Sequence, residues 1–164
     1  MIALDTNVLV RYLVGDDARQ AAVARRVIEE TLTPSEPGFV SLIVLVELNW
    51  VLDRVYGCRL NQVAAIFAEL IASPTILVEQ AAAVAAAIAQ PHDDLADSLL
   101  HEIGKTQGCA RTVPFDRKFA CLPGSSWRRD RGNIASVPLF RIPGVGDSYC
   151  ARDVKVRFNA VRRT

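Results

Sequence analysis

Residues 2–10 read Ile-Ala-Leu-Asp-Thr-Asn-Val-Leu-Val, an apolar run that ends at an aspartate and then resumes with a different period. The first four residues of the chain predict a buried strand, whereas the apolar residues from Val8 to Leu13 recur at the spacing of one helix face. A strand that leads directly into a helix is the unit from which parallel α/β sheets are built. We therefore place Asp5 at the junction of the first strand and the first helix.

The same alternation continues to about residue 113. Helices are expected at Asp17–Leu32, from a Ser41 cap to about Tyr56 with Gly57 as the stop, at Asn61–Ala72, at Glu79–Gln90, and at Asp94–Gln107 with Asp93 as the cap. Strands are expected at Phe39–Val40, Thr75–Val78 and Cys109–Val113. This alternation predicts an α/β fold, here a single three-layer domain with a central parallel sheet of four or five strands flanked by helices. Such sheets bind ligands beyond the carboxyl ends of their strands.

Charge divides the 164-residue chain into two parts. Residues 1–122 carry 10 basic and 15 acidic side chains, whereas residues 123–164 carry nine basic and three acidic ones, with three prolines and four glycines. We therefore expect a catalytic domain at 1–122 and a basic, irregular extension at 123–164. An apolar content of 51% is enough for the core of one domain.

Two classes of protein are excluded by the sequence. The four cysteines form no Cys-x-x-Cys pair, so they indicate neither a zinc knuckle nor a redox centre. The N-terminus lacks the basic segment and apolar stretch of a signal peptide, and no apolar run approaches the roughly 18 residues of a membrane span. We expect a cytoplasmic protein that makes no membrane contact.

Glu47 is the most informative single residue. It interrupts the run Leu42-Ile-Val-Leu-Val-Glu-Leu-Asn-Trp-Val-Leu52, in which almost every neighbour favours burial. An ionised carboxylate in such surroundings is costly unless a positive group meets it. The alternative is a glutamate on the one wet face of this helix.

Three aspartates add to this acidic set. Asp94 and Asp97 share a face near a predicted helix start, and Asp116 follows the last predicted strand. Each has a structural alternative, because acidic residues also cap helices and turns. If these carboxylates converge with Asp5 and Glu47, each pair of unit charges 4 Å apart costs on the order of 4 kcal/mol at an effective dielectric of 20. A divalent cation would reverse the sign of that interaction.

The types of side chain available as ligands indicate which metal ion would bind. Carboxylate oxygens without a nearby cysteine or a ligand-spaced histidine suit a hard ion, Mg²⁺ or Mn²⁺, rather than zinc. His92 and His101 are the possible exceptions. His101 lies four residues after Asp97 on the same helix face, and we expect it to be the surface partner of that aspartate.

At these residues the chain resembles the PIN-domain family and, within it, the VapC-type toxins of bacterial toxin–antitoxin pairs. The resemblance covers about residues 1–122 and rests on residues 2–10, on the segment 40–48, on Asp94-Leu-Ala-Asp-Ser-Leu-Leu100 and on Phe115-Asp-Arg-Lys-Phe119. It implies a magnesium-dependent nuclease whose catalytic metal ligands are Asp5, Glu47, Asp97 and Asp116, with Thr6, Asn7 and Asp94 lining the site.

The chain departs from the family in two places. Pro114 stands where the family usually has threonine or serine two residues before the last aspartate, so a hydroxyl that would orient the metal or its water is missing. Toxins of this kind usually end with a short strand soon after a segment such as Leu122-Pro-Gly124, yet here residues 125–164 follow. A last strand at Val137–Ile142, a disordered extension and a change of reading frame are the three interpretations of this segment.

The expected reaction is hydrolysis of an RNA phosphodiester, in which one or two metal ions polarise a phosphoryl oxygen and lower the pKa of bound water. Asp5 and Asp97 are the expected direct ligands, while Glu47 or Asp116 orients water or serves a second ion. An acidic cleft repels RNA, so basic side chains must assist binding. The candidates are Arg11, Arg117, Lys118, Arg128, Arg129 and Arg131.

The resemblance further implies a homodimer and a cognate antitoxin that blocks the cleft. The apolar stretches Val8–Val14 and Leu48–Tyr56 are candidates for these contacts, although both also fit a buried core. Two other functions compete with this one. A catalytically silent PIN-like module that binds RNA or a protein would account for Pro114 and the altered tail. A phosphatase of the haloacid dehalogenase type is disfavoured, because such enzymes use a second aspartate where this chain has Asn7.

Overall fold

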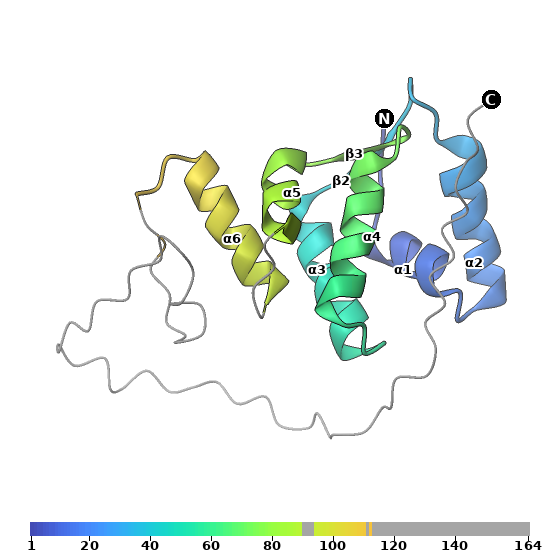
Figure 1. The fold of residues 1–164 in the computed structure, drawn as a ribbon. Helices are drawn as coiled ribbons and strands as arrows, with labels where there is room; N and C mark the ends of the chain where they lie inside the picture. Colours follow the sequence, from blue (N-terminus) through green and yellow to red (C-terminus); the bar gives the residue numbers. More distant parts are fainter. Residues whose placement is uncertain (90–93, 111, 113–164) are drawn as a thin grey trace, which may run out of the picture.

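The computed structural model describes residues 1–89, 94–110 and 112, which form a helix-rich α/β fold (Figure 1). Three parallel strands, β1 (Ile2–Ala3), β2 (Gly38–Val40) and β3 (Ile76–Val78), pair in the order β1-β2-β3. The helices are α1 (Thr6–Val14), α2 (Ala18–Arg25), α3 (Leu42–Arg54), α4 (Leu60–Ala72), α5 (Ala81–Ala89) and α6 (Leu95–Thr106). Figure 1 shows α1 and α2 on one side of the molecule, α5 and α6 on the other, and α3 and α4 between them.

The predicted α/β class and the parallel sheet flanked by helices are therefore confirmed. The described residues contain three of the four or five expected strands. Of the expected strand Cys109–Val113, Thr112 forms an isolated bridge and the first two residues are not extended, while residues 111 and 113 lie outside the description. The proposed strand Val137–Ile142 also lies outside it.

Helix starts follow the capping residues of the sequence. The Ser41 hydroxyl accepts a hydrogen bond from Val44 N at 3.3 Å, which confirms it as the cap of α3. Asp17 accepts from Gln20 N at 2.9 Å and begins α2. Gly57 lies at φ +64° just beyond α3, in the left-handed region that glycine adopts without strain, so it ends the helix as predicted.

Two helices differ from their prediction. The segment expected as one helix over Asp17–Leu32 is an α-helix only to Arg25 and continues as the π-helix η1 (Arg26–Thr31), in which Leu32 N bonds Val27 O at 3.2 Å. Ile28 and Leu32 are both buried, as their helical spacing indicates, but that spacing did not reveal the wider turn. The cap of α6 is Asp94 rather than Asp93, because the Asp94 carboxylate accepts from Ala96 N at 2.8 Å.

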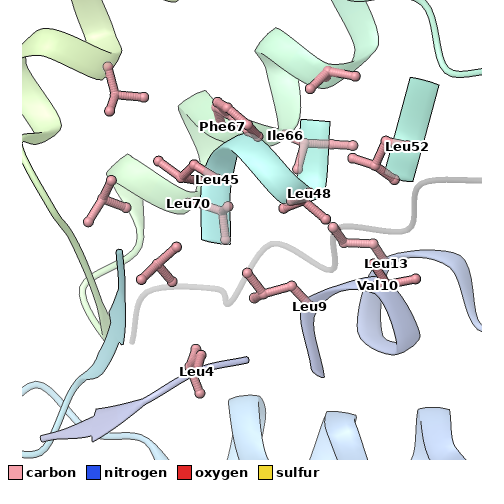
Figure 2. Close-up of a cluster of buried hydrophobic side chains, with 14 of the residues drawn as sticks. Leu4, Leu9, Val10, Leu13, Leu45, Leu48, Leu52, Ile66, Phe67 and Leu70 are labelled. Atoms are coloured by element: carbon pink, nitrogen blue, oxygen red, sulfur yellow. The ribbon is translucent and has the colours of Figure 1, made fainter. Parts of the chain in front are cut away.

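One apolar core holds the helices on the sheet. Figure 2 shows side chains of α1, α3 and α4 meeting beside Leu4 at the end of β1. The most deeply buried residues of this core include Leu9, Leu45, Leu48, Leu52 and Phe67, each with no exposed surface. Because burial of a large apolar side chain stabilises the fold by roughly 1.5–3 kcal/mol, this core fixes where α1 and α3 lie relative to the sheet.

Glycine is required at the start of the central strand. A Cβ atom at Gly38 would lie 2.7 Å from Leu32 Cδ1 and 2.8 Å from Leu4 Cδ1. These contacts are closer than van der Waals packing allows, so a larger residue here would force the buried side chains of Leu4 and Leu32 to move. In the part of the chain that the structure describes, no helix combines the length and the apolar character needed to cross a lipid bilayer.

Candidate functional site

Three polar residues follow the three strands at the same level of the sheet. The register pairs Ala3 with Phe39 and Phe39 with Leu77, so the positions two residues further along each strand are Asp5, Ser41 and Glu79. Parallel strands carry their ligand-binding groups at this carboxyl edge. The register thus brings the Asp5 motif, the start of α3 and the end of β3 to one edge.

The Asp5-Thr6-Asn7 motif is held in shape by its own hydrogen bonds. Asp5 is the N-cap of α1, and its Oδ2 accepts from Asn7 N at 3.4 Å and from Asn7 Nδ2 at 3.1 Å. Both side chains are exposed. The cap fixes the position of the Asp5 carboxylate at the N-terminal end of α1.

Thr6 connects this motif to Glu47. The Thr6 side chain is buried, at 3% exposure, and its hydroxyl donates a 2.5 Å hydrogen bond to Glu47 Oε2. The donor lies on the first turn of α1 and the acceptor on the second turn of α3, 41 residues later. A bond from a neutral hydroxyl to a carboxylate is charge-assisted and short, so it holds the Glu47 carboxylate against Thr6, the residue that follows Asp5 in the chain.

Glu47 itself lies on the wet side of α3. The core side of this helix consists of Leu45, Leu48 and Leu52, and Glu47 is exposed. The expected costly burial of this carboxylate is therefore wrong, and the alternative of a glutamate on a solvent-facing surface is correct. The apolar sequence around it misled because Ile43, Val46 and Trp50 are themselves exposed, at 79%, 41% and 59%.

Glu79 belongs to this edge of the sheet and was missed as a site residue. The sequence placed it at the start of a helix, whereas α5 begins two residues later. Its Oε2 accepts the backbone N–H of Leu42 at 2.8 Å, and its own N–H donates to Val40 O at 2.9 Å. Glu79 thus anchors the first residue of α3 to the end of β3, and so helps to position Glu47.

Helix α6 carries the other predicted acidic residues. Both lie near the start of the helix as predicted, Asp97 in its first turn and Asp94 as its cap in place of the expected Asp93. His101 is not the surface partner expected for Asp97, because the ring is buried at 6% exposure and its Nδ1 lies 3.3 Å from Thr112 Oγ1. The segment after α6 packs over this histidine, an arrangement that helical spacing alone does not reveal.

The described acidic residues do not assemble a complete metal site. Within residues 1–89, 94–110 and 112, no three Asp, Glu, His or Cys side chains lie close enough to hold one ion, so Asp5, Glu47 and Asp97 do not form such a group. Asp116, Pro114, Arg117 and Lys118 lie outside these residues, as does His92. The donor chemistry of Asp5 and Glu47 fits a hard cation, since both offer carboxylate oxygens.

A second polar network joins α1 to α3 at the opposite end of α1. Asp16, just beyond the helix, accepts from Arg11 Nη1 at 2.5 Å and from the Tyr56 hydroxyl at 2.7 Å. The bond from Arg11, then that from Tyr56, lowers the pKa of Asp16, while burial and the bond to Asp16 raise the pKa of Tyr56. Arg11 was a candidate for RNA contact, but its guanidinium is engaged in this network.

The described site has the chemical character of a cation-binding edge. It presents a carboxylate cap at Asp5, an exposed carboxylate at Glu47 and an amide at Asn7, with no salt bridge to Glu47 among the residues that the structure describes. Such a site can attract a divalent ion, and it repels a phosphate unless an ion lies between them.

Comparison with known proteins identifies the family. The model of the PIN domain matches residues 2–124, a range that contains β1 to α6 and all seven predicted site residues. No curated protein and no solved structure matches the chain. PIN domains are typically nucleases that use divalent metal ions, in accord with the acidic edge described above. From the extent of this match, the chain belongs to the PIN domain family.

Proposed function

We propose that this protein is a metal-dependent endoribonuclease that cleaves RNA phosphodiester bonds. The observation that carries the proposal is the hydrogen bond from Thr6 to Glu47, which holds a carboxylate of α3 beside the Asp5 motif at the carboxyl edge of the sheet. This is where parallel α/β sheets place their reactive groups. Membership of a family of nucleases supports the same reaction class.

Asp5, Glu47, Asp97 and Asp116 are the proposed ligands of Mg²⁺ or Mn²⁺. The ion would polarise the scissile phosphate and lower the pKa of a bound water. The protein's own residues prepare the site: Asn7 holds the Asp5 carboxylate through its amide, and Thr6 orients Glu47. Asp94 fixes the first turn of α6, on which Asp97 lies.

Within this proposal, the protein acts as the toxin of a type II toxin–antitoxin system in the cytoplasm, as a homodimer. A cavity of about 440 Å³ between α1 and α2 supports an antitoxin contact. Asn7 of the acidic edge and the apolar side chains Val8, Val23 and Val27 line it, and Val23 is 58% exposed. A protein segment seated there would lie beside Asp5 and block the site.

Cleavage of a mixed RNA pool in the presence of Mn²⁺ tests the proposed reaction. The full chain should cut the pool, and Asp5→Asn should not. Asp17→Asn is the matched control, because Asp17 is also a helix N-cap but lies at the start of α2. Metal-dependent cleavage that survives in Asp5→Asn would overturn the assignment of Asp5, and no cleavage by the parent chain would overturn the nuclease.

A second candidate function is a silent PIN module that binds RNA or protein without cutting. It is favoured by the lack of a three-ligand group in the described residues and by Pro114. A crystal soaked in Mn²⁺ separates the two functions, because the anomalous signal locates the ion and its ligands. A peak bounded by Asp5 and Glu47 supports the nuclease, and a site that binds no Mn²⁺ while RNA still binds supports the silent module.

A further inference from the structure

A cavity of about 250 Å³ lies on the exposed side of α3, separate from the acidic edge. Its walls come from three elements: α3 supplies Asn49 and Trp50, the segment that leads into α4 supplies Arg59, and the first turn of α6 supplies Leu95. Asp94, the cap of α6, also lines the cavity, whereas these four residues have no role in the function proposed above. The cavity therefore needs an explanation of its own.

The walls combine an aromatic ring and an amide with two arginines, two aspartates and apolar side chains. Trp50 is 59% exposed, although burial of a large apolar side chain is worth roughly 1.5–3 kcal/mol. Asn49 is half-buried, and its amide makes no hydrogen bond within the part of the chain that the structure describes. An exposed aromatic ring next to basic side chains is the arrangement by which proteins stack the bases of single strands and hold their phosphates.

The charges around the cavity leave a basic group available. The Arg54 guanidinium lies 3.5 Å from Asp53 Oδ2, with side chains 70% and 60% exposed, so water weakens this pair. The Asp94 carboxylate is already used as the cap of α6. Arg59 is exposed at the rim and is in no salt bridge among the described residues, which makes it free to meet an anion.

The cavity adjoins the candidate active site through two helices. On α3, its wall residue Val46 directly precedes Glu47, and on α6 its wall residue Ala96 directly precedes Asp97. A single strand crossing the acidic edge would therefore pass the cavity within a short distance along the same two helices. A duplex would keep its bases paired and could not present one to the indole.

We propose that this cavity binds one base of a single-stranded RNA, stacked on Trp50, with Asn49 bonding the base edge and Arg59 holding a phosphate. The choice of RNA as ligand rests on the proposed nuclease function. The site is a substrate contact outside the metal ligands, so it should set affinity and strand preference without taking part in the chemistry.

Indole fluorescence tests the proposal in the full chain. Trp127, which lies outside the described residues, is replaced by phenylalanine so that Trp50 is the only indole. In EDTA, a short single-stranded RNA should quench this fluorescence, and the matching duplex should quench it far less. Trp50→Ala, followed by anisotropy of labelled RNA, should weaken binding roughly tenfold, whereas Trp50→Phe should retain most of the affinity.

Matched variants separate this role from others. Ile43→Ala removes an even more exposed apolar side chain from α3, one that does not line the cavity, and should leave the affinity unchanged. Arg59→Gln should lower the salt dependence of binding by the equivalent of about one phosphate contact. This second variant keeps the proposal testable if Trp50→Ala does not fold.

Each result decides for or against the cavity. Unchanged affinity in both Trp50→Ala and Arg59→Gln overturns it, even if the protein cleaves RNA. RNA binding that depends on Trp50 in a protein without any cleavage supports the cavity and overturns only the nuclease. If Trp50→Ala changes the sedimentation of the protein but not its RNA affinity, the face is a contact between two copies of the chain and the proposal is wrong.

Discussion

Polar contacts hold both ends of α1, to Glu47 of α3 at its start and to Tyr56, two residues after α3, beyond its end, and the two contacts differ in charge balance. At the start of α1, the Thr6 hydroxyl donates to Glu47. Beyond its end, the Asp16 carboxylate accepts hydrogen bonds from both Arg11 and Tyr56. In the second contact the Arg11 guanidinium forms a salt bridge with the Asp16 carboxylate. Glu47 has no salt bridge within residues 1–89, 94–110 and 112.

This difference separates stabilisation from function. A carboxylate that is paired with a cation of the same chain contributes to the stability of the fold. A carboxylate that has only a neutral donor keeps its charge available for a ligand, at some cost to the fold from repulsion near Asp5. We therefore expect changes at Glu47 to affect activity and changes at Asp16 to affect stability, and four predictions test that division.

The largest effect is expected from Glu47→Gln. The amide preserves the shape and can still accept from Thr6, but it removes the charge, so RNA cleavage in Mn²⁺ should fall at least about 100-fold, since even groups that only orient ligands cost roughly 10–100-fold. The free energy of unfolding should stay within about 0.5 kcal/mol. Glu69→Gln, an exposed glutamate on α4, is the control. Equal activities of the two variants would abolish the distinction drawn above.

Thr6→Val comes next. It removes the donor to Glu47 while keeping a side chain of similar shape in a buried position, so activity should fall roughly 10-fold through a misplaced carboxylate. Thr6→Ser retains the hydroxyl and should recover most of the cleavage rate. Steady-state cleavage of one labelled RNA measures both variants, and a serine variant as poor as valine would mean that packing, rather than the hydrogen bond, matters here.

Asp16→Asn should act on stability instead. It removes the charged acceptor that both Arg11 and Tyr56 use, so the free energy of unfolding should fall by about 1 kcal/mol, measured by urea denaturation. Cleavage activity at saturating Mn²⁺ should remain within about twofold of the parent. A large loss of activity without a loss of stability would reverse the roles that we assign to the two ends of α1.

The smallest effect is a pH dependence at the same aspartate. Because the folded-state pKa of Asp16 is lowered, its contribution to stability is present above the ordinary carboxyl pKa and is lost as the pH falls through the folded value. Asp16 is 37% exposed, so solvent limits this contribution to about 1 kcal/mol or less. The stability gap between the parent and Asp16→Asn should therefore close in acid, as thermal unfolding at a series of pH values would show.

The local signals of the sequence predicted most of the described fold. Asp5, Ser41 and Asp17 each begin a helix as their types indicate, and Gly57 ends one. These outcomes depend on neighbouring residues only, so the sequence contains the whole cause. The π-helix η1 was not predicted, because Ile28 and Leu32 lie four residues apart and fit the face of a regular α-helix equally well.

The candidate site was predicted less completely, for the same reason. The residues of the Asp5 motif and Glu47 were identified by type, but the pairing of Thr6 with Glu47 spans 41 positions and arises from the packing of α1 on α3. Glu79 was missed because its role depends on the strand register, and the burial of His101 depends on Thr112. The roles of Asp97 and Asp116 stay predictions.

Asp5, Ser41 and Glu79 occupy equivalent positions after three paired strands. This implies that insertions are tolerated at some places in the chain and not at others. Extra residues in the connection at 33–37 leave the strand register intact, so such insertions should be accepted in the manner of surface loops. One extra residue within β2 would turn Val40 away from the core and displace the start of α3 from Glu79. Natural variants of this chain should therefore differ in length between the strands and keep constant the spacing from each strand to the polar residue that follows it.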